Sequence, residues 1–373
     1  MELYSPETKL LLDVLCGRAF SKSDKINYAR LVKLAENHDL AALIFYRLQG
    51  CGLQLPEINY SLLKSRYIKN IRANLRLWNE FLQINSEFEK NNIDMAPIKG
   101  IDILARFYPE LDLRSMVDID ILVREEQLQR VQNALCALGY HKELFNLKED
   151  YWRKQQCHIV FHNKNRITVE AHWALDFKRD NRVILPKLWK RMNKKEISGH
   201  KINLLSPEDA IFSLALHLRR YGTILSLKQV FDAARIIKES AGFDWGYMLQ
   251  ESKNGKIQAT LYFILIQITL FTQTNIPADV LREPGLALWQ KMLIKRFIKR
   301  HTFQIPVTPK KNYLAAHFLL YDNLCEPVYY LINIPYEQFC KFYNLKPYTR
   351  KADILYRLRI PYMAASLLKS QDT

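Results

Sequence analysis

Apolar and polar residues follow a helical period near both ends of the chain and a different period in the middle. Before residue 90, apolar positions such as Leu31 and Leu34 recur every three or four residues, as on one face of a helix. This spacing predicts one helix over residues 29–48 and a long one over residues 59–90. Beyond Ser206 the helical period returns and continues, so the chain is expected to be mostly helical.

The period changes in the middle of the chain, where short apolar runs alternate with short helical segments. IDMAPI and MVDIDILV have the pattern of strands, with a helix at residues 100–108 between them and another at 125–138 after them. HIVFH and RITVEAHWAL then form a strand pair around the turn at residues 163–165. This order predicts an α/β unit with a small mixed sheet.

These patterns together predict an α+β protein that is mostly helical overall. The small mixed sheet is expected to form a core flanked by helices on both sides of it in the chain. Three regions are expected: N-terminal helices over 1–90, the α/β core over 91–205 and a C-terminal helical region over 206–373.

Asp118 and Asp120 are the first candidate functional residues, because they interrupt an apolar run. Side chains on a strand alternate between its two faces, so both carboxylates lie on one face while Ile119 and Ile121 lie on the other. Neighbouring carboxylates are costly unless a cation lies beside them, and a divalent metal is the simplest candidate. The pair alone is weak support for a metal site.

Three neighbouring motifs strengthen this interpretation. Glu170 lies on the predicted strand RITVEAHWAL and supplies a third carboxylate, and oxygen ligands are those that Mg²⁺ or Mn²⁺ prefers. Two further motifs lie where helix amides or cationic side chains could meet phosphate oxygens. The expected metal ligands are Asp118, Asp120 and Glu170, and the expected phosphate-binding residues are Lys99, Gly100, Arg114 and Ser115.

A site of this kind suits phosphoryl or nucleotidyl transfer, in which two metal ions about 4 Å apart clamp the attacking and leaving oxygens. Asp118 and Asp120 would hold the ion that carries a triphosphate. Glu170 would bind the second ion and accept the proton of an acceptor hydroxyl. Lys99 and Arg114 would neutralise the β- and γ-phosphates as pyrophosphate leaves.

Several motifs follow one another in a fixed order: Lys99-Gly100, Phe107-Tyr108-Pro109, Arg114, Asp118-Ile119-Asp120, Leu138-Gly139-Tyr140 and Glu170-Ala171-His172-Trp173, followed by HLRRYG and Asp232. In this order they resemble the nucleotidyltransferases related to DNA polymerase β, and within them the bacterial group called nucleotidyltransferase family 5. The resemblance covers most of residues 10 to 240 and implies a polymerase β-like nucleotidyltransferase core.

The chain departs from the wider superfamily at one point. The Gly-Ser pair that usually stands shortly before the two aspartates is absent, and Lys99-Gly100 stands further upstream. This arrangement resembles the nucleotidyltransferases of abortive-infection systems, which also place a Lys-Gly and an Arg-x-Ser before the aspartates. It indicates a variant of the site and leaves its triphosphate contacts open.

Other polar residues have both a structural and a functional interpretation. His172 is either a packed histidine beside Trp173 or a supporting residue behind the metal ligands. Asp232 either supports the site or forms an ion pair with Arg235, and the structural role is favoured. A zinc site is not expected, because the cysteines show no metal-binding spacing.

Composition narrows the partners without identifying them. The net charge of +17 favours anionic partners, so an NTP substrate is expected and nucleic acid is a further candidate. No transmembrane segment is expected, since the most apolar stretch, residues 260–271, is too short. The N-terminus lacks the basic region of a signal peptide and the six cysteines are scattered, so a reducing, cytoplasmic location is expected.

The first hypothesis is therefore an Mg²⁺-dependent enzyme that moves NMP from an NTP such as ATP to an acceptor and releases pyrophosphate. The acceptor is a small molecule, a peptide or protein, or an RNA end. The alternative is a catalytically silent module that binds nucleotide or nucleic acid. A third possibility is a kinase, which would use metal ions bound by the same carboxylates. The sequence does not determine the base, the acceptor, export, the oligomeric state or the role of residues 240–373.

Overall fold

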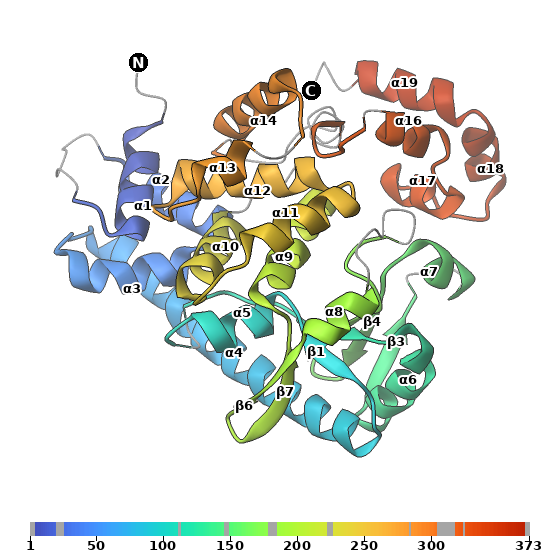
Figure 1. The fold of residues 1–373 in the computed structure, drawn as a ribbon, viewed down its shortest axis with the longest axis horizontal. Coiled ribbons are helices and arrows are strands. Elements are labelled where there is room, and N and C mark those ends of the chain that lie inside the picture. Colours follow the sequence, from blue (N-terminus) through green and yellow to red (C-terminus); the bar gives the residue numbers. More distant parts are fainter. Residues whose placement is uncertain are drawn as a thin grey trace.

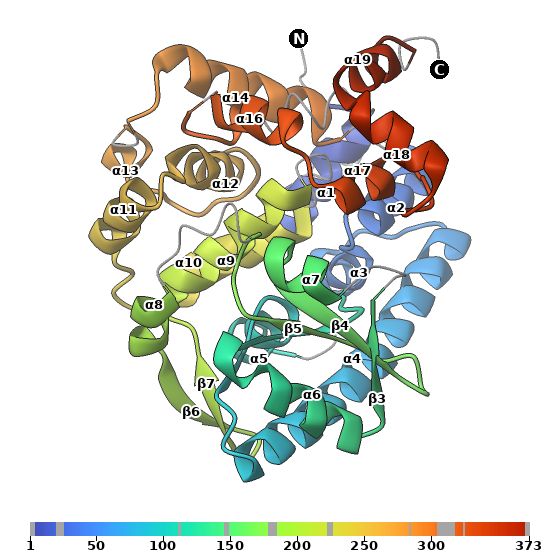
Figure 2. The same cartoon turned by 90° about the vertical axis from the view of Figure 1, so that its right-hand side faces the viewer.

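A five-stranded mixed sheet lies among helices, which confirms the expected α+β fold, mostly helical with a small mixed sheet. Figures 1 and 2 show α9 to α14 on one side of this sheet and the long helix α4 along another. The computed structural model describes residues 4–19, 26–110, 113–144, 149–177, 185–221, 227–282, 285–303, 318–323 and 325–369.

The sheet has the strand order β1-β2-β5-β4-β3. β2 and β5 pair in parallel, and the other neighbouring strands pair antiparallel. The parallel pair matters for function, because it joins the strand of the aspartates to the strand of the third carboxylate. The strands are β1 (Met95–Pro97), β2 (Ile119–Val123), β3 (Tyr140–Glu143), β4 (His158–Asn163) and β5 (Thr168–His172).

The helices before the sheet agree with the predicted pattern except at one break. α1 begins as expected, with Ser5 Oγ accepting a hydrogen bond from Thr8 N. The single helix expected over 29–48 is wrong: the chain forms two helices, and Asp39 between them adopts a positive φ of 56°. Aspartate tolerates this left-handed backbone conformation, so the chain can turn at Asp39. The apolar residues on both sides of the turn still keep a helical spacing, which hides the break. These helices are α1 (Pro6–Cys16), α2 (Tyr28–Asn37), α3 (Ala41–Cys51) and α4 (Glu57–Lys90).

Three helices and a short 3-10 turn accompany the strands of the sheet. α5 packs against β1 and β2, and α6 packs against β3 and α4. The helix expected at 125–138 begins as the 3-10 turn η1 and ends before Gly139, whose φ of 82° suits a residue without a side chain. These elements are α5 (Gly100–Phe107), η1 (Glu125–Gln127), α6 (Leu128–Ala137) and α7 (Glu149–Gln155).

A separate two-stranded sheet, which the sequence pattern did not predict, follows helix α8 (Leu185–Arg191). It pairs β6 (Asn193–Ile197) with β7 (His200–Leu204) in antiparallel register. β6 has no buried residue, so it lacks the apolar alternation that marks a strand. Only β7 buries side chains, those of Ile202 and Leu204.

The second half of the described chain is helical, as expected. α12 is buried on almost every side, and no helix among the described residues is long and apolar enough to cross a membrane. The helices are α9 (Pro207–Tyr221), α10 (Leu227–Glu239), α11 (Trp245–Asn254), α12 (Gln258–Phe271), α13 (Ala278–Arg282), α14 (Leu288–His301), α16 (Cys325–Ile332), α17 (Tyr336–Phe342), α18 (Arg350–Arg357) and α19 (Arg359–Lys369).

Two apolar clusters stabilise these helices. The main cluster is continuous from Leu10 to Leu320 and includes the sheet, while a small one gathers Phe339, Cys340 and Ala352 near the C-terminus. The helices of the small cluster are drawn in red in Figure 1. Residues 325–369 therefore contribute little to the core that supports the sheet.

A buried ion pair joins the segment that leads into β2 to α10. Arg114 Nε lies 3.0 Å from both carboxylate oxygens of Asp232, and its Nη2 lies 2.9 Å from Oδ2. The hydroxyl of Tyr108 donates to the same carboxylate over 2.9 Å. Asp232 is fully buried, so its charge is compensated by these contacts and not by water.

Removing one partner of this pair is expected to be costly. Asp232→Ala leaves the buried guanidinium of Arg114 uncompensated and should lower the free energy of unfolding by about 3–5 kcal/mol. Asp94→Ala breaks the exposed ion pair of Asp94 with Arg124 and should cost about 0–1 kcal/mol. Urea denaturation of both variants measures the difference, and equal losses would contradict a structural role for the buried pair.

Candidate functional site

Two acidic side chains lie opposite each other on the parallel strands β2 and β5. In the register of the pair, Asp120 lies across from Glu170 and Ile119 across from Val169. Ile119 and Val169 are completely buried. Because side chains alternate along a strand, the two carboxylates share the other face of the sheet.

Lys99 and His172 hold these carboxylates in place. His172 Nε2 lies 2.9 Å from Asp120 Oδ1 and 3.2 Å from Glu170 Oε2. Lys99 Nζ donates to Asp120 Oδ1 and lies 4.0 Å from Glu170 Oε2. One ligand atom from each of Asp120, Glu170 and His172 lies within 4.8 Å of the others, which is close enough for one cation to contact all three.

Asp118 lies at the edge of this group, one residue before β2. Burial, and then the charges of Asp120 and Glu170, raise the pKa of Asp118 to about 7, while Lys99 and Lys228 act in the opposite direction. The negative charges of Asp120 and Glu170 therefore repel ionised Asp118. Asp118 holds a proton more readily near neutral pH than Asp120 does.

Asp120 and His172 behave as an ion pair. Burial alone would raise the pKa of Asp120, but Lys99 and His172 outweigh it and hold that pKa well below its ordinary value. Burial and the charge of Lys99 favour neutral His172, yet its contacts with Asp120, Cys157 and Glu170 raise the pKa of His172 to about 9. His172 therefore contacts both carboxylates directly while lying completely buried, and its functional role stays a prediction.

The backbone of Lys99 adopts a strained conformation where β1 leads into α5. Its φ of 52° and ψ of −114° lie in a region that residues with a side chain rarely adopt. Such strain costs about 1–3 kcal/mol and persists only where the surrounding structure enforces it. This backbone conformation positions the ammonium group of Lys99 so that it donates a hydrogen bond to Asp120.

The other residues expected to bind phosphate have protein partners. Arg114 pairs with Asp232, and Ser115 Oγ donates to the carbonyl oxygen of Asp39 over 3.2 Å. A Cβ atom on Gly100 would lie 3.2 Å from Arg114 Nη1 and 3.1 Å from Met116 Sδ, so glycine allows close packing here. Phosphate binding by these residues stays a prediction.

One expected contact near the site differs, and one residue escaped the sequence reasoning. Asp232 makes a structural ion pair, but its partner is Arg114 and not Arg235, which donates to the carbonyl oxygen of Phe107. Lys228 at the start of α10 lies close enough to Asp118 to lower its pKa and donates to Asp39 over 3.0 Å. It follows Asp118 by 110 positions, so no local spacing could reveal it.

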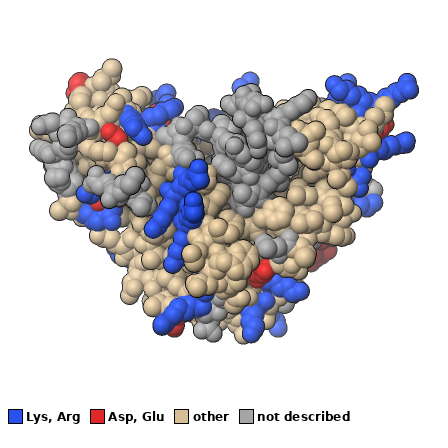
Figure 3. All heavy atoms as spheres, turned by 90° about the horizontal axis from the view of Figure 1, so that it is seen from above, with Lys and Arg blue, Asp and Glu red and all other residues tan. Residues whose placement is uncertain are grey.

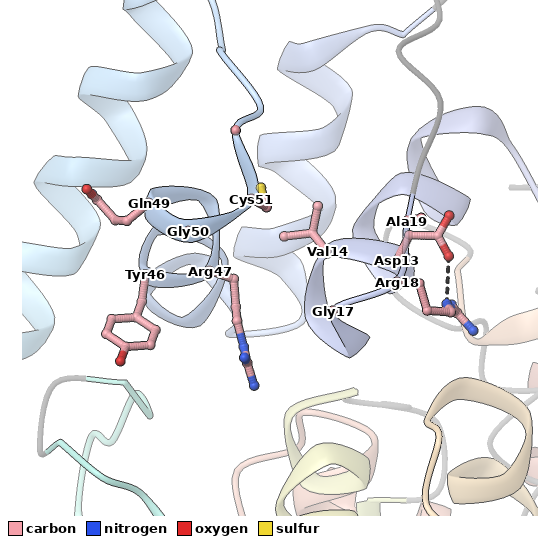
Figure 4. Close-up of a pocket in the computed structure, with 11 residues that line it drawn as sticks. Asp13, Val14, Gly17, Arg18, Ala19, Tyr46, Arg47, Gln49, Gly50 and Cys51 are labelled. Atoms are coloured by element: carbon pink, nitrogen blue, oxygen red, sulfur yellow. Dashed lines mark ion pairs between the residues drawn. The ribbon is translucent and has the colours of Figure 1, made fainter.

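A pocket of about 830 Å³ lies elsewhere, between the ends of α1 and α3 (Figure 4). Its lining includes Arg47 and the pair Arg18–Asp13, whose Nε and Oδ1 lie 2.7 Å apart. Asp13 is the one acid among its lining residues. This pocket therefore offers no group of carboxylates and is separate from the candidate site.

The donors at the sheet fit a divalent cation. Asp120 and Glu170 provide carboxylate oxygens, the ligands of Mg²⁺ and Mn²⁺, and Asp118 lies near enough to add its charge. Lys99 and His172 are positive side chains in contact with Asp120 and Glu170, so three carboxylates exceed these two charges. Binding a cation would relieve their repulsion, and the donors do not select between Mg²⁺ and Mn²⁺.

Comparison with solved structures gives distant similarities. The antibiotic-resistance factor ANT(2'')-Ia has a TM-score of 0.36 and 11% identity, over 53% of this chain and 98% of that chain. An antigenic nucleotidyltransferase-like protein from Paracoccidioides brasiliensis has a TM-score of 0.36 and 13% identity, over 55% of this chain and 96% of that chain. No curated protein sequence matches the chain.

A family model matches residues 24–273, and its description is uncharacterised nucleotidyltransferase. The match covers the N-terminal helices after α1, the whole sheet and the helices as far as α12. It confirms the resemblance found from the motifs around Lys99, Asp118 and Glu170. The chain belongs to this family of uncharacterised nucleotidyltransferases.

Proposed function

We propose that this protein is an Mg²⁺-dependent enzyme that transfers NMP from an NTP to an acceptor and releases pyrophosphate. The observation that supports this most is the position of Asp120 and Glu170 on neighbouring parallel strands, with His172 and Lys99 in contact with both. Asp118, whose pKa responds to the charges of both acids, would add a third carboxylate. Mn²⁺ could replace Mg²⁺ with the same ligands.

Each residue of the site has a definite part in this proposal. Asp118, Asp120 and Glu170 would hold Mg²⁺, which stabilises charge on the phosphates and lowers the pKa of an acceptor hydroxyl. Glu170 is more exposed than Asp120 and accepts the proton of the acceptor hydroxyl. Lys99 and Lys228 offer positive charge to the phosphates, and Arg114 adds positive charge behind Asp120.

The acceptor is a hydroxyl or phosphate group of a small molecule, a peptide or protein, or an RNA end. A second candidate, a module that binds nucleotide or nucleic acid without catalysis, is favoured by the net charge of +17. Figure 3 shows one face on which Lys and Arg side chains are prominent and acidic ones are few. That module would bind NTP or RNA without forming product, whereas a kinase would form ADP instead of pyrophosphate.

The first test removes the carboxylates. Asp118→Asn and Asp120→Asn should each lower Mg²⁺-dependent pyrophosphate release by at least about 100-fold, because a metal ligand contributes several kcal/mol to stabilising the transition state. Labelled ATP, GTP, CTP and UTP are tested against small hydroxyl compounds, peptides and RNA. Glu126→Gln, an exposed acid on η1, serves as the matched control and should keep full activity.

Two outcomes would contradict this proposal. Wild-type rates in both Asp→Asn variants would show that the carboxylates are not the catalytic ligands. Tight Mg²⁺–NTP binding with no pyrophosphate from any acceptor class would favour the silent module, while ADP formation would favour the kinase.

The strain at Lys99 gives a second test that uses two variants. Lys99→Ala and Lys99→Gly both remove the ammonium group, so both should lose most pyrophosphate release. Glycine adopts a positive φ without strain, so Lys99→Gly should be more stable than Lys99→Ala by about 1 kcal/mol. Urea denaturation measures this difference, and equal stability would show that the backbone at Lys99 is relaxed.

The raised pKa of Asp118 predicts how stability depends on pH. The folded protein binds this proton more tightly than the unfolded chain, so ionisation of Asp118 destabilises the fold as pH rises from about 4 through about 7. In EDTA, Asp118→Asn should therefore melt at an increasingly higher temperature than the wild type between pH 5 and pH 8.

Added Mg²⁺ should remove this advantage at pH 8, because the cation stabilises ionised Asp118 in the wild type. Glu89→Gln, an exposed acid on α4, is the control and should show no such trend. Thermal unfolding followed by circular dichroism provides the measurement. A constant difference between Asp118→Asn and wild type at all pH values would contradict the predicted proton binding.

A further inference from the structure

A second group of metal-binding side chains lies directly behind the carboxylates. Cys157 comes just before β4, His158 begins that strand, and His172 ends β5. One ligand atom of each lies within 4.8 Å of the other two. The antiparallel register places His158 across from His172, and their ring centroids are 4.8 Å apart.

The two nitrogens of His172 have different surroundings. Nε2 contacts Asp120, Glu170 and Lys99, as described above. Nδ1 is completely buried and has no nitrogen or oxygen partner among the described residues, while the Cys157 thiol lies near enough to raise the pKa of the ring. A buried nitrogen without a strong hydrogen-bond partner is costly, and a cation held between this nitrogen and the sulfur would satisfy it.

The two ring nitrogens of His158 also face different groups, one toward the thiol and one toward a carboxylate. Its Nδ1 lies 3.6 Å from Cys157 Sγ, and its Nε2 lies 3.9 Å from Glu170 Oε2. In a tetrahedral zinc site, Zn–S bonds of about 2.3 Å and Zn–N bonds of about 2.05 Å place sulfur and nitrogen about 3.6 Å apart. The sulfur and nitrogen of this pair already have that separation.

We propose that Cys157, His158 and His172 form a binding site for a zinc-type transition-metal cation, distinct from the Mg²⁺ site. Thiolate and imidazole ligands prefer such a cation, whereas Mg²⁺ prefers oxygen. Metal-binding histidines usually donate their other N–H to a carboxylate, and here those carboxylates are Asp120 and Glu170. The cation would therefore fix the imidazole that supports the proposed Mg²⁺ ligands. This inference does not depend on nucleotidyl transfer.

The proposed site differs from the expectation drawn from the sequence. A zinc site was not expected, because the cysteines have no regular spacing. The three side chains come from two antiparallel strands, so their proximity depends on strand pairing. Cys157 and His158 are adjacent in sequence, but His172 reaches them only across the sheet.

The test uses Co²⁺ as a spectroscopic probe for zinc, added to the reduced full-length protein. A thiolate ligand gives an intense sulfur-to-cobalt charge-transfer band in the near ultraviolet, which an oxygen site does not give. Wild type should bind one equivalent of Co²⁺ with this band, and Zn²⁺ should displace it. Cys157→Ser should abolish the band, while Cys136→Ser, which changes an exposed cysteine on α6, should keep it.

Two further variants separate the possible explanations. His158→Ala keeps the thiol but should weaken Zn²⁺ binding at least about 10-fold, the smallest loss usual for a partner that only supports a ligand. Asp118→Asn should keep the band even though it loses pyrophosphate release, so failure of the enzymatic proposal remains distinguishable. Far-UV circular dichroism confirms that each variant folds.

No charge-transfer band in folded wild type would overturn the proposal. So would a band that persists in Cys157→Ser, or unchanged Zn²⁺ affinity in folded His158→Ala. In these cases the thiol of Cys157 would serve only as a neighbour of the two imidazoles.

Discussion

Asp120 and Glu170 lie side by side on one face of the sheet, and Asp118, just before β2, is close enough to feel their charges. The three carboxylates repel one another, and the site exists because other residues offset that repulsion. Lys99 and His172 each contact both Asp120 and Glu170. Their positive charges keep Asp120 ionised despite its burial. The compensation is incomplete, since the pKa of Asp118 still rises to about 7. The site is thus stable enough to fold and remains short of positive charge, which suits a site that binds cations.

The strands and helices around the site supply the positions that this balance requires. The parallel pairing of β2 and β5 places Asp120 across from Glu170. The strained turn before α5 brings Lys99 to them, and Gly100 lets that turn pack against Arg114 and Met116. Arg114 is in turn held by Asp232, so α10 is tied to the segment that leads into β2. A change in this buried pair would move the aspartates as well as loosen the fold.

The candidate transition-metal site and the carboxylate site would share His172. Its Nε2 faces the acids and its buried Nδ1 has no nitrogen or oxygen partner among the described residues, so one imidazole ring separates a site rich in oxygen from one with sulfur and nitrogen. Such an arrangement would make the geometry of Asp120 and Glu170 respond to the metal behind them. Within an uncharacterised family, this gives the enzyme a feature that can be tested without knowing the acceptor.

The sequence alone determined those features that depend on local order. The period of two places Asp120 on the face opposite Ile119, and the helical period and caps such as Ser5 locate most helices. Motifs in a fixed order also identified the family. The break at Asp39 and the strand β6 escaped this reasoning. The turn at Asp39 leaves the helical spacing of apolar residues undisturbed, and β6 has no buried residues that would create a strand period.

Only the tertiary structure decided which distant groups meet. Asp232 pairs with Arg114, 118 positions away, and not with Arg235, which donates to the carbonyl oxygen of Phe107. Lys228 reaches the neighbourhood of Asp118, and His172 reaches Cys157 and His158 across paired strands. Alternation and helical spacing are properties of a short segment, whereas these contacts depend on which strand lies beside which and how a helix packs onto the sheet. That is why the carboxylates were visible in the sequence and most of their partners were not.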